Sequence, residues 1–345
     1  MRVAAFDYDL PAELIAQHPL SERDASRMLV VDRVTRMWHD SAFASLPDFL
    51  RANDVLVLNN TRVFPARLLG QRSPSGGAVE VLLLRELEPR VWSALARPAR
   101  RLRTGTQITF GEGKLRGEVI ESRADGVRVL RFESEQPLNA VIDEIGRTPL
   151  PPYIKRETEQ SSSDGERYQT VYAKKRGAIA APTAGLHFTP RILREIETRG
   201  ARLAEITLHV GYGTFEPVRA EVIGEHRVAP EWFSVSDKAA EVMNHARAAG
   251  GRIIAIGTTT ARALESSVRD DGQIVPHSGF ADLTIVPGYR FRAVDAQLTN
   301  FHLPRSSLLL LVSAFAGRGL TIAAYEHAVR QRYRFYSFGD CMLVL

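Results

Sequence analysis

The chain has 345 residues, of which 44% are hydrophobic and 25% are charged. This length exceeds the ~100–150 residues typical of one domain, and disordered chains are less hydrophobic, so we expect two folded domains. The only cysteine, Cys341, excludes disulfide frameworks and cysteine-based zinc or iron–sulfur sites. We expect a cytoplasmic protein without a metal, whose net charge of +5 allows a polyanionic partner.

The N-terminal residues predict no secretion signal, because Asp7 and Asp9 interrupt their apolar run. The longest apolar run, residues 308–315, is much shorter than the ~20 residues that a membrane span needs. It predicts a buried helix, and we expect no contact with a membrane.

In chain order, residues 11–17 predict a short helix and residues 54–58 a buried strand. From residue 63 to about 136 the apolar runs are short and turn signals are frequent. Asp125-Gly126 lies between two β-like runs and predicts a two-residue hairpin turn. This region therefore predicts a small barrel.

Residues 155–169 have almost nothing to bury and predict a mobile lid or linker. Strand and helix patterns then alternate. Thr189 predicts a helix N-cap, as does Ser236, and residues 253–256 predict a buried strand that leads into another helix. This alternation indicates α/β layers around a largely parallel sheet.

The sequence lacks several familiar catalytic motifs. It contains no complete dinucleotide fingerprint, phosphate-binding loop, Gly-x-Ser-x-Gly or His-Glu-x-x-His motif, which argues against nucleotide hydrolysis and zinc proteolysis. Polar and glycine residues instead follow the predicted strands, where ligands of open α/β sheets bind. These candidates are Asn60, Arg62, His187, His209, Gly211, Gly213, Thr214, Thr258, Thr259, Arg262, Asn300 and His302.

Two of these patterns have an ordinary structural alternative. Thr258 and Thr259 at a helix start, with Arg262 nearby, predict a site for a carboxylate or phosphate, although simple helix capping explains them equally well. A packed, partly buried side chain is the alternative for each histidine.

Arginines gather in two runs. One comprises residues 97–103, and the other has Arg330, Arg332 and Arg334 interleaved with aromatic residues at 333, 335 and 336. Such a pattern suits the phosphates and bases of single-stranded RNA. A solvated charged surface is the alternative for each run.

Seven segments together resemble one enzyme family. They are AFDYDLPAELIAQHPL, NNTRVFPARLLG, PLPPYIKR, ERYQTVYAKKRGAIAAPTAGLHFT, HVGYGTFEPV, IAIGTTTARALES and TNFHLPRSSLLLLVSAFAG. The chain resembles the S-adenosylmethionine:tRNA ribosyltransferase-isomerases of queuosine biosynthesis, from residue 6 to the C-terminal Tyr-Ser-Phe-Gly-Asp.

The resemblance implies a reaction and an architecture. The ribosyl part of S-adenosylmethionine would be transferred to 7-aminomethyl-7-deazaguanine at the wobble position of a tRNA anticodon loop and rearranged, giving epoxyqueuosine-tRNA, adenine and methionine. S-adenosylmethionine is a co-substrate, and no prosthetic group or metal is implied. The implied fold is a large mixed α/β domain, residues 1–62 and 151–345, with a smaller inserted β-barrel domain at 63–150. We expect a monomer.

The sequence departs from the family pattern at several positions. Val228 and Ala229 stand where the family usually has Met and His, Tyr212 replaces a smaller residue, and Ala263 stands where a threonine is common. We therefore assign no catalytic role to residues 226–231 and treat Tyr212 as a possible substitution in the pocket wall.

The chemistry assigns roles to the candidates. A sulfonium acidifies the adjoining ribose C–H, so the reaction needs a base, for which His187, His209 and His302 are the candidates. The predicted co-substrate contacts are Ala184, Gly185, Gly211, Gly213, Thr214, Thr258, Thr259 and Arg262. The predicted tRNA contacts are Asn60, Arg62, Asn300, Arg330, Arg332 and Arg334.

Two other functions stay open on the sequence. An S-adenosylmethionine-dependent RNA methyltransferase would give S-adenosylhomocysteine instead of adenine and methionine. A non-catalytic RNA-binding protein would consume no co-substrate.

Overall fold

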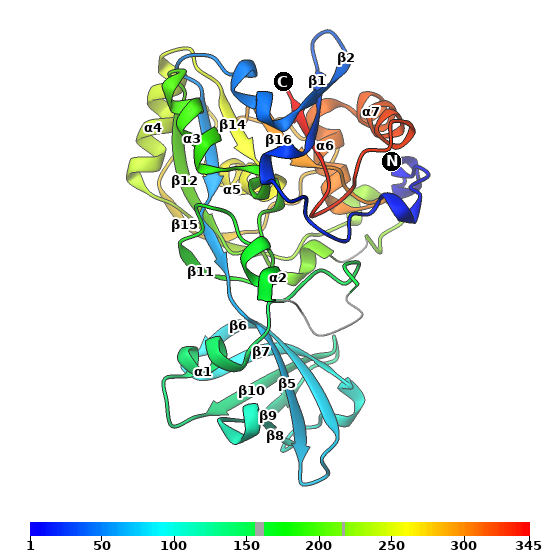
Figure 1. Cartoon of the computed structure of the whole chain (residues 1–345), viewed down its shortest axis with the longest axis vertical. Helices are drawn as coiled ribbons and strands as arrows, with labels where there is room; N and C mark the ends of the chain where they lie inside the picture. Colours follow the sequence, from blue (N-terminus) through cyan, green and yellow to red (C-terminus); the bar gives the residue numbers. More distant parts are fainter. Residues whose placement is uncertain (156–161, 216–217) are drawn as a thin grey trace. The chain divides into compact units, whose positions relative to one another are not determined.

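The computed structural model describes residues 1–155, 162–215 and 218–345 and divides into two compact units (Figure 1). The first, called the α/β unit, contains Met1–Arg62, Pro152–Lys155 and Arg167–Leu345. The second, called the barrel unit, contains Val63–Pro151 together with residues 162–166.

A nine-stranded mixed sheet forms the centre of the α/β unit, in the order β15-β13-β12-β3-β14-β16-β17-β1-β2. The four central strands, β12, β3, β14 and β16, run parallel, and β1 is parallel to β17. Antiparallel pairs join β16 to β17 and form both edges. The expectation of a largely parallel sheet is thus correct for the four central strands and for the β17–β1 pair, and wrong for the other pairs. The strands are β1 (Arg27–Asp32), β2 (Met37–Ala42), β3 (Val55–Asn59), β12 (Arg202–Leu208), β13 (Glu231–Val235), β14 (Ile253–Ile256), β15 (His277–Ala281), β16 (Ala296–Asn300) and β17 (Cys341–Val344).

Helices begin where the sequence supplies a cap. The Thr189 hydroxyl accepts a hydrogen bond from the amide of Ile192 at 3.3 Å, and the Ser236 hydroxyl accepts one from Ala239 at 3.2 Å, as predicted. Residues 11–17 contain only a short 3-10 turn, η2 (Ala12–Leu14). The α-helices of this unit are α3 (Pro190–Thr198), α4 (Asp237–Ala248), α5 (Thr258–Glu265), α6 (Ser307–Ala316) and α7 (Arg318–Arg330). The short elements used below are β4 (Thr61–Val63), which pairs with β11 (Lys175–Ala178), and the 3-10 turns η4 (Phe43–Phe49), η7 (Thr183–His187) and η8 (Tyr212–Phe215).

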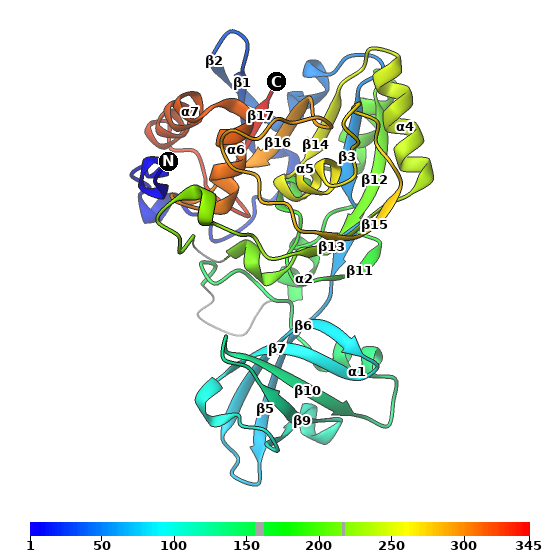
Figure 2. The same cartoon turned by 180° about the vertical axis from the view of Figure 1, so that it is seen from behind.

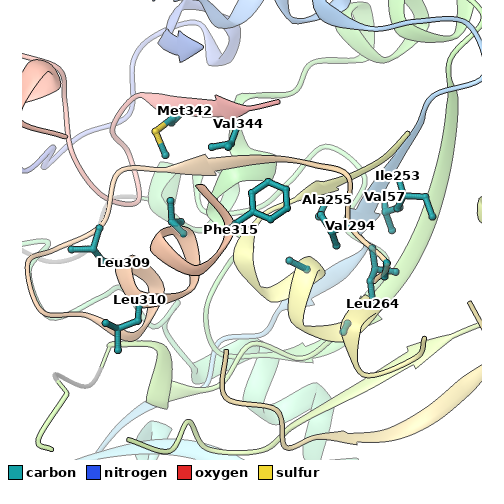
Figure 3. Packing of buried hydrophobic residues seen from close by; sticks show 14 of the residues in the cluster. Val57, Ile253, Ala255, Leu264, Val294, Leu309, Leu310, Phe315, Met342 and Val344 are labelled. Atoms are coloured by element: carbon teal, nitrogen blue, oxygen red, sulfur yellow. The ribbon is translucent and has the colours of Figure 1, made fainter. Parts of the chain in front are cut away.

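Both faces of the sheet are covered, as expected for buried parallel strands. On β3, Val55 and Val57 pack with helices α4 to α7, whereas Leu56 and Leu58 pack with η4 and α3. Figure 3 shows part of the first cluster, in which Val57 lies beside β14 and Phe315 projects from α6. Alternate residues of one strand therefore serve two cores.

The apolar run at 308–315 forms the buried helix α6, as predicted. Among the described residues, no single helix has the length and apolar composition to cross a membrane. Helices α6 and α7 meet those criteria only as a pair, and that pair bends by 116°.

The barrel unit is a closed antiparallel barrel in the order β10-β7-β6-β5-β8-β9, seen from two sides in Figures 1 and 2. The Asp-Gly hairpin forms, but its loop has four residues, 123–126, because the amide of Gly126 bonds to the carbonyl of Arg123 and the Asp125 carboxylate accepts from Val127. The two-residue turn was wrong. The elements are β5 (Arg67–Ser73), β6 (Ala78–Glu88), β7 (Val91–Arg97), β8 (Gln107–Phe110), β9 (Leu115–Ser122), β10 (Val127–Glu133) and α1 (Leu138–Ile145).

The segment expected to be mobile, residues 155–169, lies partly outside the described residues, at 156–161. Residues 162–167 form helix α2 (Ser162–Arg167), and Tyr168 is fully buried. The expectation that this stretch has almost nothing to bury is therefore wrong at its C-terminal end.

Candidate active site

A cavity lies at the carboxyl ends of β14 and β16 in the α/β unit. Because these strands are parallel neighbours, their ends meet at the same edge of the sheet, where ligands of such sheets bind. The space free of atoms at this site, including open solvent at the mouth, is about 510 Å³, and only a small part of it is enclosed by the protein. Its lining residues are Ala180, Ala181, Pro182, Thr183, Ala184, Val210, Gly257, Thr258, Thr259, Thr299, Asn300, Phe301, His302, Leu308, Tyr336 and Ser337.

The first turn of α5 forms one wall. Gly257 connects β14 to α5 with φ of +96°, a conformation that favours glycine. Thr258 and Thr259 then face the cavity, and the first amides of an α-helix have no partner within the helix. These amides and the positive end of the helix dipole suit a carboxylate or phosphate.

The end of β16 contributes an uncharged side chain to the cavity wall, that of His302. His302 is 5% exposed, and burial lowers its pKa to about 3. Its Nε2 lies 3.2 Å from the Thr299 hydroxyl and its Nδ1 lies 3.2 Å from the Tyr325 hydroxyl. His302 is therefore uncharged at neutral pH, and both ring nitrogens have partners.

His187 lines a different, smaller cavity beside the first one, and the two share Ser337. Its Nδ1 lies 2.9 Å from the Ser26 hydroxyl, its Nε2 lies 3.3 Å from Asn300 Nδ2, and its ring packs on Phe43. Burial, with weaker effects from two arginines, lowers its pKa to about 3. Among the described residues, a hydrogen bond to Asn300 links the His187 side chain to the main cavity.

His209 lies outside both cavities. Its Nδ1 is 2.8 Å from the Thr61 hydroxyl, its ring stacks on Trp232 at 5.0 Å, and burial lowers its pKa. The His209 ring is closely packed against the backbone of Gly177, because a Cβ at position 177 would collide with it.

Arg262 also lies away from the cavity. Its guanidinium forms a buried ion pair with Glu231 at 3.2 Å and donates to the carbonyls of Ala229 at 3.0 Å and Ala281 at 2.7 Å. These contacts join α5 to β13 and β15, so the geometry provides no anion site at Arg262. Thr258 and Thr259 alone remain at the predicted site.

Among the described residues, only one of the remaining predicted co-substrate contacts lines the main cavity. Ala184 lines the cavity, but Gly185 does not, and a Cβ there would collide with the Tyr172 hydroxyl. The amide of Gly211 donates to Glu231 at 2.7 Å. Gly213 borders another cavity, described below, and Thr214 lies in η8, although its side chain is outside the described part of the chain.

The predicted tRNA contacts are dispersed. The Asn60 amide bonds to Thr207 at 2.7 Å and to Glu205 at 3.1 Å, which satisfies both of its ends, and Arg62 is exposed on β4. Asn300 lines the cavity.

In the second arginine run, Arg330 and Arg332 are exposed, whereas Arg334 is half-buried and donates to the carbonyl of His18. The interleaved aromatic residues, Tyr333, Phe335 and Tyr336, are buried. Tyr333 and Phe335 belong to the packed interior and provide no stacking surface for bases, whereas Tyr336 lines the main cavity.

Two of the departures from the family pattern, Val228 and Ala229, lie at a third cavity. Val228, Ala229 and Gly213 line it together with His226 and Ser307, which lie 2.7 Å apart at Nε2 and Oγ. Tyr212 precedes Gly213 in η8, and Ala263 is fully buried in α5.

Sequence reasoning missed more than half of the main cavity. The missed residues include 180–183, Thr299, Tyr336 and Ser337. Thr299 directly precedes Asn300 at the end of a predicted strand, which was a usable signal. Tyr336 and Ser337 belong to a C-terminal segment that is far in sequence from the other wall residues. Local sequence patterns do not predict that they line the cavity.

Comparison with known proteins decides the family. Residues 3–344 match the queuosine biosynthesis protein family. The chain belongs to the queuosine biosynthesis protein family. The S-adenosylmethionine:tRNA ribosyltransferase-isomerases of Symbiobacterium thermophilum, Halothermothrix orenii and Desulforamulus reducens are 50%, 48% and 46% identical to it, and each alignment covers 100% of both chains.

A solved structure shows the same likeness. The crystal structure of an S-adenosylmethionine tRNA ribosyltransferase from Thermotoga maritima is 37% identical, with a TM-score of 0.57, over 99% of this chain and 100% of that one. The mixed α/β fold with a β-barrel that the resemblance implied is therefore confirmed for this queuosine biosynthesis family member. Among the described residues, no group of three or more His, Cys, Asp or Glu is placed to hold a metal ion.

Proposed function

We propose that this chain is an S-adenosylmethionine:tRNA ribosyltransferase-isomerase. It transfers the ribosyl moiety of S-adenosylmethionine to 7-aminomethyl-7-deazaguanine at the wobble position of tRNA and isomerises it, releasing adenine and methionine. The observation that carries the proposal is full-length similarity to relatives bearing that name, at 46–50% identity.

The main cavity is the proposed site for S-adenosylmethionine. The co-substrate has a carboxylate, for which the first turn of α5 at Thr258 and Thr259 offers amide donors. It also has a cationic sulfonium, beside which an uncharged His302 causes no repulsion, whereas a protonated imidazole would. The remainder of the wall is mostly apolar and makes few hydrogen bonds to water, which would quench a reactive intermediate.

The identity of the general base stays a prediction. Of the three candidate histidines, His302 alone lines the main cavity. Efficient general bases have pKa values near the working pH, and burial takes His302 well below that range. The substrate amine or a bound water is therefore the competing proton acceptor.

The tRNA partner is proposed to bind through its anticodon loop, in the cytoplasm, to a monomeric enzyme. The exposed side chains of Arg330 and Arg332 support a contact with phosphates near the α/β unit's C-terminal segment. Arg334 is not included because it already donates to the carbonyl of His18.

The test is an analysis of the small-molecule products. The enzyme is incubated with S-adenosylmethionine and a tRNA carrying 7-aminomethyl-7-deazaguanine, and the products are separated by chromatography. Adenine and methionine in equal amounts support the proposal. S-adenosylhomocysteine would indicate a methyltransferase, and unchanged co-substrate with bound tRNA would indicate a non-catalytic RNA-binding protein.

A further inference from the structure

One buried polar atom in the cavity wall has no partner among the described residues. Asn300 is 2% exposed and lines the cavity, yet its Oδ1 accepts no hydrogen bond. Buried amide oxygens are nearly always hydrogen-bonded, by protein, water or ligand. This oxygen is therefore an acceptor available to a molecule in the cavity.

The orientation of the Asn300 amide is fixed by its surroundings. Its Nδ2 lies 3.1 Å from the carbonyl oxygen of Tyr336 and 3.4 Å from that of Asp340. A carbonyl only accepts hydrogen bonds, so the nitrogen must face these two groups, and Oδ1 must point away from them. A flipped amide would place three acceptors together.

His187 adds a third constraint on the same nitrogen. Its Nε2 lies 3.3 Å from Asn300 Nδ2 and accepts from it, which leaves the hydrogen on Nδ1 to be donated to the Ser26 hydroxyl at 2.9 Å. The Ser26–His187–Asn300 chain thus runs from the smaller cavity to the wall of the main one. A neutral histidine in this position acts on Asn300 and touches no ligand in the main cavity.

We propose that Asn300 binds S-adenosylmethionine through Oδ1, which accepts a hydrogen bond from an N–H or O–H donor of the co-substrate, and that His187 is the positioning residue that holds the Asn300 amide. This inference rests on the proposed function. The donor is either the ammonium of the methionyl arm or a group of the adenosine part, and both share the chemistry that Oδ1 requires.

Calorimetric titration of the full-length protein tests the proposal, with S-adenosylmethionine and 5′-methylthioadenosine as probes. Asn300→Leu should weaken S-adenosylmethionine binding roughly tenfold, the loss expected for one buried hydrogen bond. The matched control is Gln297→Leu on the same strand, because Gln297 is fully buried but does not line the cavity, and it should bind like wild type. 5′-Methylthioadenosine lacks the amino-acid arm, so an equal loss with this probe places the donor on the adenosine part. Retained affinity places it on the ammonium.

A second pair of variants keeps the proposal testable if Asn300→Leu does not fold. His187→Gln retains an acceptor near the position of Nε2 and should keep most of the affinity, whereas His187→Leu should lose it. The proposal is overturned if folded Asn300→Leu, or both His187 variants, bind S-adenosylmethionine like wild type. If the wild-type protein alone binds no S-adenosylmethionine, the same titrations are repeated with the tRNA bound, and no binding of S-adenosylmethionine in either state would instead refute the proposed function.

Discussion

The ends of β16 and β12 look alike in sequence but differ in what their polar groups contact. At the end of β16, Asn300 and His302 line a cavity, and Asn300 Oδ1 has no partner among the described residues. At the end of β12, His209 is held by Thr61 and Trp232, and the Gly211 amide is bonded to Glu231. A polar residue at a strand end thus contributes to a site only where it faces a cavity, and Asn300 also keeps one atom available to a ligand.

The largest expected loss of stability follows from breaking the buried ion pair between Arg262 and Glu231. Arg262→Ala leaves Glu231 as a buried charge without its main partner, so the free energy of unfolding should fall by about 3–5 kcal/mol. S-adenosylmethionine affinity of the folded fraction should stay unchanged. Chemical denaturation and calorimetry measure the two quantities.

A double-mutant cycle with Glu231→Gln is the control, since removing both charges should recover part of the loss. If Arg262→Ala were stable but bound S-adenosylmethionine about 1.5–3 kcal/mol more weakly, the range for a charge-assisted hydrogen bond, Arg262 would belong to the binding site after all.

Acid should destabilise the folded protein through the two buried histidines. The pKa of His187 and that of His302 fall from 6.5 to about 3 on folding. Between these values the unfolded chain binds a proton at each position and the folded chain does not, so stability is complete above pH 6.5 and is lost as pH falls toward 3. Each histidine contributes up to about 1.4 kcal/mol per pH unit.

Replacing either histidine with Gln should flatten the dependence of unfolding free energy on pH by that amount, although each variant starts from lower stability. Urea titrations at several pH values from about 4 to 7, within the range where the two states differ in bound protons, give the slopes. An unchanged slope in both variants would mean that these side chains are protonated in the folded protein, which their burial opposes.

Substitutions of two threonines in the first turn of α5 should differ in their effect on S-adenosylmethionine affinity, and this effect is smaller. Thr258 lines the cavity, whereas the Thr260 hydroxyl donates to the carbonyl of Ile256 at 2.7 Å within the protein. Thr258→Val should weaken S-adenosylmethionine binding by about 0.5–1.5 kcal/mol, and Thr260→Val should not change it. Equal affinities in the two variants would remove the Thr258 hydroxyl from the site.

The smallest change in stability should follow from the exposed arginines. Replacing Arg330 and Arg332 together with Ala should change unfolding free energy by less than about 0.5 kcal/mol. It should also reduce the slope of log tRNA affinity against log salt, by roughly 0.9 for each phosphate that the variant no longer neutralises. Binding measured across a salt series checks this, and an unchanged slope excludes the segment from the tRNA interface.

Much of the fold could be predicted because its signals are local. The Thr189 and Ser236 caps, the buried strand at 253–256 and the apolar helix α6 each depend on a few adjacent residues. The hairpin at Asp125 was predicted, but its loop length was not, since the Asp125 side chain bonds to Val127 instead of closing a two-residue turn.

The site was harder to predict, because whether a polar residue faces the cavity depends on contacts with residues far away in sequence. Nothing near Arg262 in sequence indicates that Glu231, on a separate strand, neutralises it. Likewise, Tyr333 and Phe335 alternate with arginines as in an RNA-binding surface, yet they are buried in the core, and Tyr336 lines the cavity. The family resemblance supplied the reaction, and three-dimensional packing was needed to distinguish wall residues from framework residues.

The most direct test is a crystal structure with S-adenosylmethionine bound. It should place the co-substrate in the cavity between α5 and the end of β16, with its carboxylate at the amides of Thr258 and Thr259 and a donor group at Asn300 Oδ1. Density for the co-substrate beside His209 and Trp232, or in the cavity lined by Val228 and Ala229, would contradict this account.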